Sequence, residues 1–136
     1  MGEYTINELE VGMSASMAKT VTEADVVLFA GVTGDFNPAH IDEEYAQASM
    51  FKGRIAHGML SAGFISATLA MKLPGPGCIY MSQNMKFKAP VKIGDTVKTT
   101  VTISDVNIKR KIVKLDTACS VGGKNVVVGD CVMMKP

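Results

Sequence analysis

The stretch IAHGMLSAGFISATLAM at residues 55–71 decides the fold, because it contains no Asp, Glu, Lys or Arg. A membrane-spanning helix needs about 20 predominantly apolar residues, whereas this stretch is shorter and carries polar residues such as His57, Ser61 and Ser66. A helix that is apolar on nearly every side is otherwise buried inside a protein. The run LPGPG at residues 73–77 then ends it. We therefore expect a long helix that other elements surround.

Beyond Gly77 the sequence changes to a two-residue period, which is typical of β-strands with one buried face. Gly122-Gly123 predicts a hairpin turn into a last strand at residues 126–134, and residues 13–21 predict an early strand. The alternating apolar positions are Met85, Phe87 and Ala89; Val97, Val101 and Ile103; and Val113, Leu115, Thr117, Cys119 and Val121. The pattern indicates an α+β fold with an antiparallel sheet curled around the helix.

Such a sheet leaves strand edges and a groove uncovered, and a second copy of the chain is an economical cover for both. Two further helices are expected before the long one. Thr22 and Asp25 resemble a capping box that opens a helix running to about Gly34, and Asp42 is a candidate cap for a short helix through Ala48.

Length and charge exclude several classes of protein. The chain has 136 residues, which suits one domain over residues 1–136, and 14 Lys and Arg against 13 Asp and Glu leave a net charge of +1. Neither nucleic acid nor an anionic membrane is an indicated partner. The one basic cluster, residues 109–111, reads as a solvated turn or strand edge.

The cysteines and the N-terminus predict the compartment. Cys78, Cys119 and Cys131 are odd in number, lack CxxC spacing and lie among apolar residues, which favours reduced, buried thiols. The first ten residues show no cationic start followed by an apolar run, so no secretory signal is expected. These features favour a cytoplasmic protein.

The segment TGDFNPAH at residues 33–40 is the candidate site, because it sets a carboxylate, Asp35, and an imidazole, His40, five residues apart. Gly34, Asn37 and Pro38 are turn-forming residues that can bend the chain and hold both side chains over one water molecule. A paired base and acid is what adding or removing water requires. The alternative is a loop held by an Asx-turn, with a histidine that only satisfies its own hydrogen bonds.

Two blocks, residues 29–40 and 53–60, resemble the MaoC-like hotdog family, specifically the (R)-specific enoyl-CoA hydratases. Tyr80 and the segments at residues 87–91 and 94–95 fit the strand and turn pattern of that family. The resemblance covers nearly the whole chain and implies a hotdog fold, an antiparallel sheet wrapped around a long central helix.

Residue 39 departs from the family pattern, because Ala39 stands where members usually carry Leu, Ile or Val. The catalytic pair is unaffected. The smaller side chain is expected to loosen the packing behind the loop or to change the size of the acyl pocket.

The resemblance implies that Asp35 and His40 hold a water and deliver it to C3 of a trans-2-enoyl-CoA, giving an (R)-3-hydroxyacyl-CoA. The developing charge on the thioester oxygen needs a donor, and the first backbone N–H groups of the long helix lack intrahelical partners. By resemblance we assign the amide of Gly58 to that oxygen. No metal and no separate cofactor are implied, since the substrate carries coenzyme A, and the partners expected are the acyl-CoA and further copies of the chain, as a homodimer or larger assembly.

Three further residues are expected to support the site, and the sequence leaves more than one role open for two of them. His57 is a second imidazole that either joins the chemistry or, as we favour, has a structural role at the helix entrance. Asn37 is expected to hold the loop, because a neutral amide neither takes nor gives a proton near pH 7. Ser66 is either a polar helper in the site or a buried hydroxyl that bonds to its own helix.

Two competing functions share the expected fold. An acyl-CoA thioesterase attacks the carbonyl carbon, but residues 55–71 contain no carboxylate that could serve such a hydrolase. A non-catalytic acyl-thioester binding module would need neither Asp35 nor His40. We therefore expect a hydro-lyase.

Overall fold

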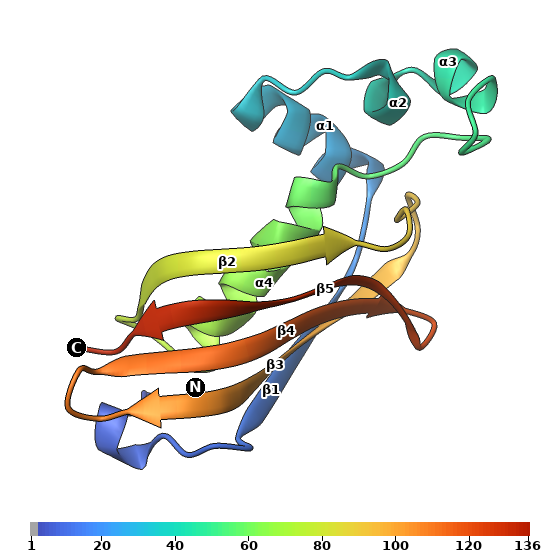
Figure 1. Cartoon of the computed structure of the whole chain (residues 1–136). Helices are drawn as coiled ribbons and strands as arrows, with labels where there is room; N and C mark the ends of the chain where they lie inside the picture. The colour runs from blue at the N-terminus through green and yellow to red at the C-terminus, as the bar shows by residue number, and fades with distance from the viewer. Residues whose placement is uncertain (1–2) are drawn as a thin grey trace.

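The computed structural model describes residues 3–136. A short 3₁₀ turn, η1, precedes a strand, four helices and four further strands (Figure 1). The elements are η1 (Ile6–Glu8), β1 (Ser14–Thr20), α1 (Glu23–Thr33), α2 (Pro38–Ile41), α3 (Glu43–Gln47), α4 (Gly58–Met71), β2 (Ile79–Phe87), β3 (Thr96–Asn107), β4 (Ile112–Val121) and β5 (Lys124–Met134).

The five strands form one sheet in the order β1-β3-β4-β5-β2, with every neighbouring pair antiparallel. The sheet curls beneath α4, while α1, α2 and α3 lie beyond the N-terminal end of that helix (Figure 1). The α+β arrangement predicted from the periodicity is confirmed. β1 and β2 are the edge strands of this single chain.

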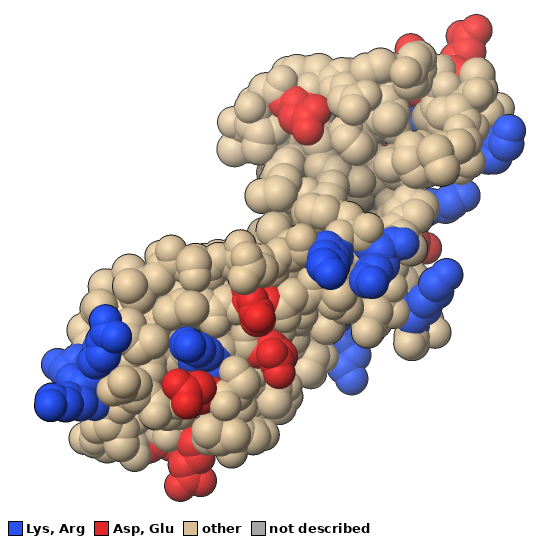
Figure 2. Space-filling view, in the orientation of Figure 1, with Lys and Arg blue, Asp and Glu red and all other residues tan. Residues whose placement is uncertain are grey.

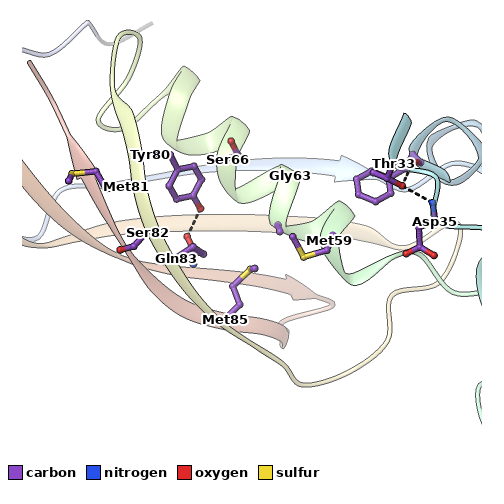
Figure 3. Close-up of a pocket in the computed structure, with 12 residues that line it drawn as sticks. Thr33, Asp35, Met59, Gly63, Ser66, Tyr80, Met81, Ser82, Gln83 and Met85 are labelled. Carbon is purple, nitrogen blue, oxygen red and sulfur yellow. Dashed lines mark hydrogen bonds between the residues drawn. The ribbon is translucent and has the colours of Figure 1, made fainter. Parts of the chain in front are cut away.

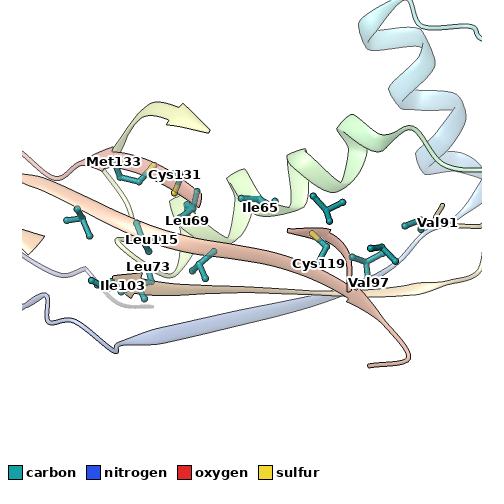
Figure 4. Close-up of a cluster of buried hydrophobic side chains, with 14 of the residues drawn as sticks. Ile65, Leu69, Leu73, Val91, Val97, Ile103, Leu115, Cys119, Cys131 and Met133 are labelled. Carbon is teal, nitrogen blue, oxygen red and sulfur yellow. The ribbon is translucent and has the colours of Figure 1, made fainter. Parts of the chain in front are cut away.

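Helix α4 packs one face onto the sheet. Its buried residues are Ser61, Ile65, Thr68 and Leu69, whose three- and four-residue spacing marks one side of an α-helix. Ile65 and Leu69 meet buried side chains of the strands, including Leu115 and Cys119, in the core shown in Figure 4. The opposite face of α4 stays open in the single chain, with Met59 56% exposed. The sheet therefore buries the helix on one side only, and the predicted groove lies on the other.

The predicted helix caps are confirmed. Thr22 and Asp25 form the capping box of α1, with the Asp25 N–H donating to the Thr22 hydroxyl over 3.1 Å. Hydrogen bonds from the Lys19 side chain and from the Thr22 backbone lower the pKa of Asp25. Gly34 ends α1 in the left-handed conformation, at φ 81°. The Asp42 carboxylate caps α3 by accepting from the Tyr45 N–H.

The segment at residues 33–40 was predicted to be a bend between helices, and the structure corrects this for its last part, because Pro38–Ile41 form the one-turn helix α2. The Asn37 side chain accepts from the Ala39 N–H over 3.1 Å, and Pro38 occupies the first helical turn. Asn and Pro favour turns, but the same two residues also begin helices. His40 is consequently held on a helical turn.

The strand predictions hold for β3, β4 and the Gly122-Gly123 hairpin, and residues 109–111 form an exposed turn as predicted. Strand β2 differs. It ends at Phe87, so Ala89 lies outside it, and Phe87 is 53% exposed where an inward-facing side chain was expected. Its ring instead lies against the start of α4.

The three cysteines are free thiols, with Cys119 and Cys131 buried and Cys78 half-buried. Burial raises the pKa of the Cys131 thiol to about 12, so this group stays protonated at neutral pH. Within residues 3–136, none of the helices combines the length and the apolar character that crossing a membrane requires.

Gly129→Ala is expected to destabilise the protein by on the order of 3 kcal/mol, because a methyl group there would lie 1.8 Å from the Asn84 carbonyl oxygen of the neighbouring strand. Neither backbone can yield without opening the β2–β5 pairing. Gly31→Ala in α1 is the matched control, since among residues 3–136 no heavy atom outside its chain neighbours and the adjoining helix backbone would lie within 4 Å of its added methyl. Chemical denaturation of both variants measures the difference, and equal stabilities would contradict this explanation.

Candidate active site

Asp35 lies on the loop that joins α1 to α2, and local hydrogen bonds orient it. Its N–H donates to the Thr33 hydroxyl over 3.2 Å, while its Oδ1 accepts from the Asn37 N–H over 3.2 Å. The Thr33 hydroxyl in turn donates to the Phe29 carbonyl at the end of α1. Asp35 is exposed, so its carboxylate remains accessible to a ligand.

His40 is buried on α2, and its tautomer follows from its partner. Nδ1 lies 2.8 Å from the main-chain carbonyl oxygen of Ile55. A carbonyl oxygen can only accept, so Nδ1 carries the hydrogen, and in the neutral ring Nε2 is left with a free lone pair. His40 therefore presents a hydrogen-bond acceptor, the form that a general base requires.

His57 precedes α4 as its N-terminal capping residue and is 2% exposed. Its Nε2 donates to the main-chain carbonyl oxygen of Asp35 over 2.9 Å, and its ring stacks on that of His40, with centroids 3.9 Å apart. Nδ1 of His57 is buried and has no hydrogen-bond partner among the described residues. The contacts of His57 thus link the Asp35 backbone to the His40 ring.

One carboxylate oxygen of Asp35, one ring nitrogen of His40 and one of His57 all lie within 4.8 Å of one another. A water at normal hydrogen-bond length can bridge two atoms as far apart as ~5.6 Å. A metal fits the two histidines poorly. A metal ion bound by both rings would have to lie in both ring planes, because each nitrogen lone pair lies in the plane of its ring. The two planes are inclined by only 30° with centroids 3.9 Å apart, so they do not cross within the ~2.0–2.1 Å of a metal–nitrogen bond from both nitrogens.

Gly58 begins α4, so its N–H has no intrahelical acceptor and lies at the positive end of the helix dipole. The Phe87 ring covers its Cα. A methyl group built on Gly58 would lie 2.8 Å from Cε1 of Phe87 and 3.0 Å from Cδ1. Only glycine therefore fits beneath the ring as it stands.

Two cavities approach each other at this cluster. The larger, of about 620 Å³, runs along the open face of α4 beside β2 and includes Asp35 near the start of the helix (Figure 3). The smaller, of about 330 Å³, is lined by His40, His57, Gly58 and Phe87 among others. Asp35 thus borders the larger cavity and His40 the smaller one, so the pair lies where the two cavities come close together.

Ser66 lies apart from the cluster. It lines the larger cavity about two helical turns after Gly58 in α4, whereas Asp35 lies near the start of that helix (Figure 3). Tyr80 lines the same cavity, and burial raises the pKa of its hydroxyl to about 12. The structure thus brings Asp35, His40 and His57 together, with Gly58 in the adjoining cavity, and places Ser66 in the larger cavity, apart from this cluster.

Sequence reasoning missed two residues at the site. Arg54, which directly precedes the uncharged stretch at residues 55–71 and was assigned no role from the sequence, donates through Nε to the main-chain oxygen of His40 over 2.6 Å. Phe87, interpreted only as a strand residue, covers Gly58. Arg54 lies four residues before Gly58, within the block at residues 53–60 that carries the family resemblance, and this position is a signal that could have found it. No local signal links Phe87 to Gly58.

Comparison with solved structures defines the class of protein. The chain superimposes on the unliganded R-hydratase of Pseudomonas aeruginosa with a TM-score of 0.92 and 44% identity, covering 97% of this chain and 85% of the other. It matches the (R)-hydratase of Aeromonas caviae with a TM-score of 0.92 and 38% identity, covering 95% and 98% of the two chains. The fold is the predicted hotdog fold.

The model of the MaoC-like domain matches residues 7–124, and the chain belongs to this family. It is also 56% identical over 133 residues to a protein of Rhodospirillum rubrum named (R)-specific enoyl-CoA hydratase, a match that covers 98% of this chain and 92% of the relative. The family resemblance read from residues 29–40 and 53–60 is confirmed.

Proposed function

We propose that this protein is an (R)-specific enoyl-CoA hydratase, a hydro-lyase that adds water reversibly to a trans-2-enoyl-CoA. The observation that carries the proposal is the cluster of Asp35 and His40 side-chain atoms within 4.8 Å, beside the N-terminus of α4. The 56% identity to an (R)-specific enoyl-CoA hydratase supports the same reaction.

In the proposed mechanism one water donates its two hydrogens to the Asp35 carboxylate and to Nε2 of His40. The water oxygen then keeps a lone pair for C3 of the enoyl group. As the C3–O bond forms, the pair takes one proton from the water and the electrons of the C2–C3 double bond move toward C2 and the thioester oxygen. The pair then returns a proton to C2, so the elements of water are added across the double bond. The Ile55 carbonyl holds His40 in the tautomer that this step needs.

The thioester is placed in the smaller cavity, where the Gly58 N–H can donate to its oxygen as negative charge develops there. No separate cofactor takes part, because the coenzyme A is carried by the substrate. The three free thiols support a reducing compartment, and we propose the cytoplasm.

A single assay with crotonyl-CoA tests the reaction by following the enoyl absorbance and free thiol together. Loss of absorbance without thiol release, with (R)-3-hydroxybutyryl-CoA as the product on chiral analysis, is the expected result. Thiol release would instead identify a thioesterase, and no change in either signal would favour a binding module. A series of longer enoyl-CoA substrates would then measure how deep the acyl pocket is.

Lys88 is placed to attract the coenzyme A phosphates, because it is exposed and lines the same cavity as His40 and Gly58. Lys88→Glu is expected to raise KM for crotonyl-CoA about fivefold with little change in kcat, and the effect should shrink at high salt. Lys109→Glu is the control, because Lys109 lies in the exposed turn between β3 and β4 and does not line this cavity. A rise in KM that does not depend on salt, or an equal rise in KM in both variants, would argue against this role.

We propose that the protein is a homodimer in which a second copy covers the open face of α4 and the edge strand β2. Ile79, Met81 and Met59 are each about half exposed on these elements. The face seen in Figure 2 is hollowed between the α1–α3 segment and the sheet, and most of the side chains around the hollow are neither Lys or Arg nor Asp or Glu. Sedimentation equilibrium should give at least twice the 14.4 kDa of one chain, and a monomer would contradict the proposal.

A further inference from the structure

Arg54 joins two helices that flank the candidate site. Its side chain is 14% exposed, and Nη1 donates to both carboxylate oxygens of Glu23, over 2.8 and 2.7 Å, in the first turn of α1. Its Nε donates to the main-chain oxygen of His40, over 2.6 Å, in α2. One guanidinium therefore connects α1 to the residue that carries the catalytic imidazole.

The backbone beside Arg54 makes further contacts with the same region. The Arg54 N–H donates to the Glu43 carboxylate over 3.1 Å, and the Ile55 N–H donates to the Ala39 carbonyl oxygen over 3.2 Å. The Ile55 carbonyl oxygen accepts from Nδ1 of His40. His40 is thus held at two points, its main-chain oxygen by Arg54 and its ring by Ile55.

Arginine suits this place because its planar guanidinium carries several N–H donors in a fixed fork. Nε and Nη1 face different partners, so both bonds can form at once. The ammonium of lysine is a single point on a flexible chain and cannot reproduce this geometry. Glu23 balances the charge of the mostly buried guanidinium.

We infer that Arg54 is a positioning residue for His40, setting the imidazole against Asp35 by holding the His40 main chain to α1. The inference rests on the proposed hydratase function. Arg54 contacts neither the carboxylate of Asp35 nor the start of α4 in the described hydrogen bonds, so it acts through His40. Displacing a reacting group by about 1 Å can cost on the order of a hundredfold in rate.

The test uses Arg54→Met, Arg54→Lys and Glu23→Gln in the full-length protein. Arg54→Met is expected to lower kcat for crotonyl-CoA about tenfold or more with KM within about twofold of wild type, since the cavity walls around Gly58 and Lys88 are untouched. Arg54→Lys should recover part of kcat, and Glu23→Gln should lower it less. Arg110→Met is the matched control, because Arg110 is the other arginine of the chain and lies in an exposed turn.

A second readout does not depend on activity. Nitrogen-15 NMR of the histidine rings should show His40 protonated at Nδ1 in the wild type and in Arg110→Met, and a mixed or altered tautomer in Arg54→Met. Wild-type kcat and an unchanged His40 signal in Arg54→Met would overturn the inference. If that variant does not fold, wild-type kcat and an unchanged His40 signal in both Glu23→Gln and Arg54→Lys overturn it. A wild-type protein that hydrates no enoyl-CoA would refute the proposed function instead, while the NMR result would still decide whether Arg54 positions His40.

Discussion

Asp35→Asn is expected to lower kcat for crotonyl-CoA hydration by about a hundredfold or more, in line with the usual contribution of a positioned acid or base. Asparagine keeps a side-chain oxygen that can accept from the Asn37 N–H, so the loop should keep its shape. The amide cannot take a proton from water near neutral pH. The loss should therefore appear in kcat while the thermal unfolding temperature stays near that of the wild type.

His40→Ala removes the other half of the pair and should have an effect of similar size. Asp42→Asn is the control for both changes, because it makes the same carboxylate-to-amide substitution two residues after His40, at a helix cap where Asn serves as well as Asp. Its kcat should match that of the wild type. If Asp35→Asn or His40→Ala turned over at nearly the wild-type rate, the role assigned to that residue would be wrong.

Gly58→Ala is expected to lower kcat by on the order of a hundredfold. The added methyl would lie 2.8 Å from the Phe87 ring, so either the ring or the start of α4 must shift. A shift of α4 moves the N–H proposed to stabilise the thioester oxygen, and loss of one such donor costs on the order of 3 kcal/mol in the barrier. Steady-state kinetics measures the effect, with Gly31→Ala as the control for glycine replacement in a helix.

The double variant Gly58→Ala with Phe87→Leu separates a displaced amide from a blocked cavity. Leucine lacks the ring that meets the new methyl, so α4 can return to its place and kcat should recover at least tenfold over Gly58→Ala alone. A double variant as slow as Gly58→Ala would mean that the methyl itself excludes the substrate. Gly58→Ala with nearly wild-type kcat would contradict the role given to the Gly58 amide.

The elements that the sequence predicted well are those whose signals lie within a few residues. The two residues of the capping box, Thr22 and Asp25, are three positions apart, and the burial alternation in β3 and β4 repeats every two residues. The short helix α2 escaped prediction because Asn37 and Pro38 favour both a turn and a helix start, and their local chemistry is the same in either case.

Within the candidate site, the motif at residues 33–40 pointed to Asp35 and His40, but it could not show what holds them. The bond from His40 to Ile55 joins residues 15 apart in the chain, that from His57 to Asp35 joins residues 22 apart, and that from Arg54 to Glu23 joins residues 31 apart. Such pairs leave no periodic pattern, because their meeting depends on how helices pack.

By itself the sequence determined an antiparallel sheet around one long apolar helix and a carboxylate–imidazole pair on a bend, since caps, turns and periodicity act between near neighbours. Only the tertiary structure decided that His57 stacks on His40, that Phe87 covers Gly58 and which face of α4 stays open. These features depend on side-chain packing between distant segments, where shape and burial outweigh local preference.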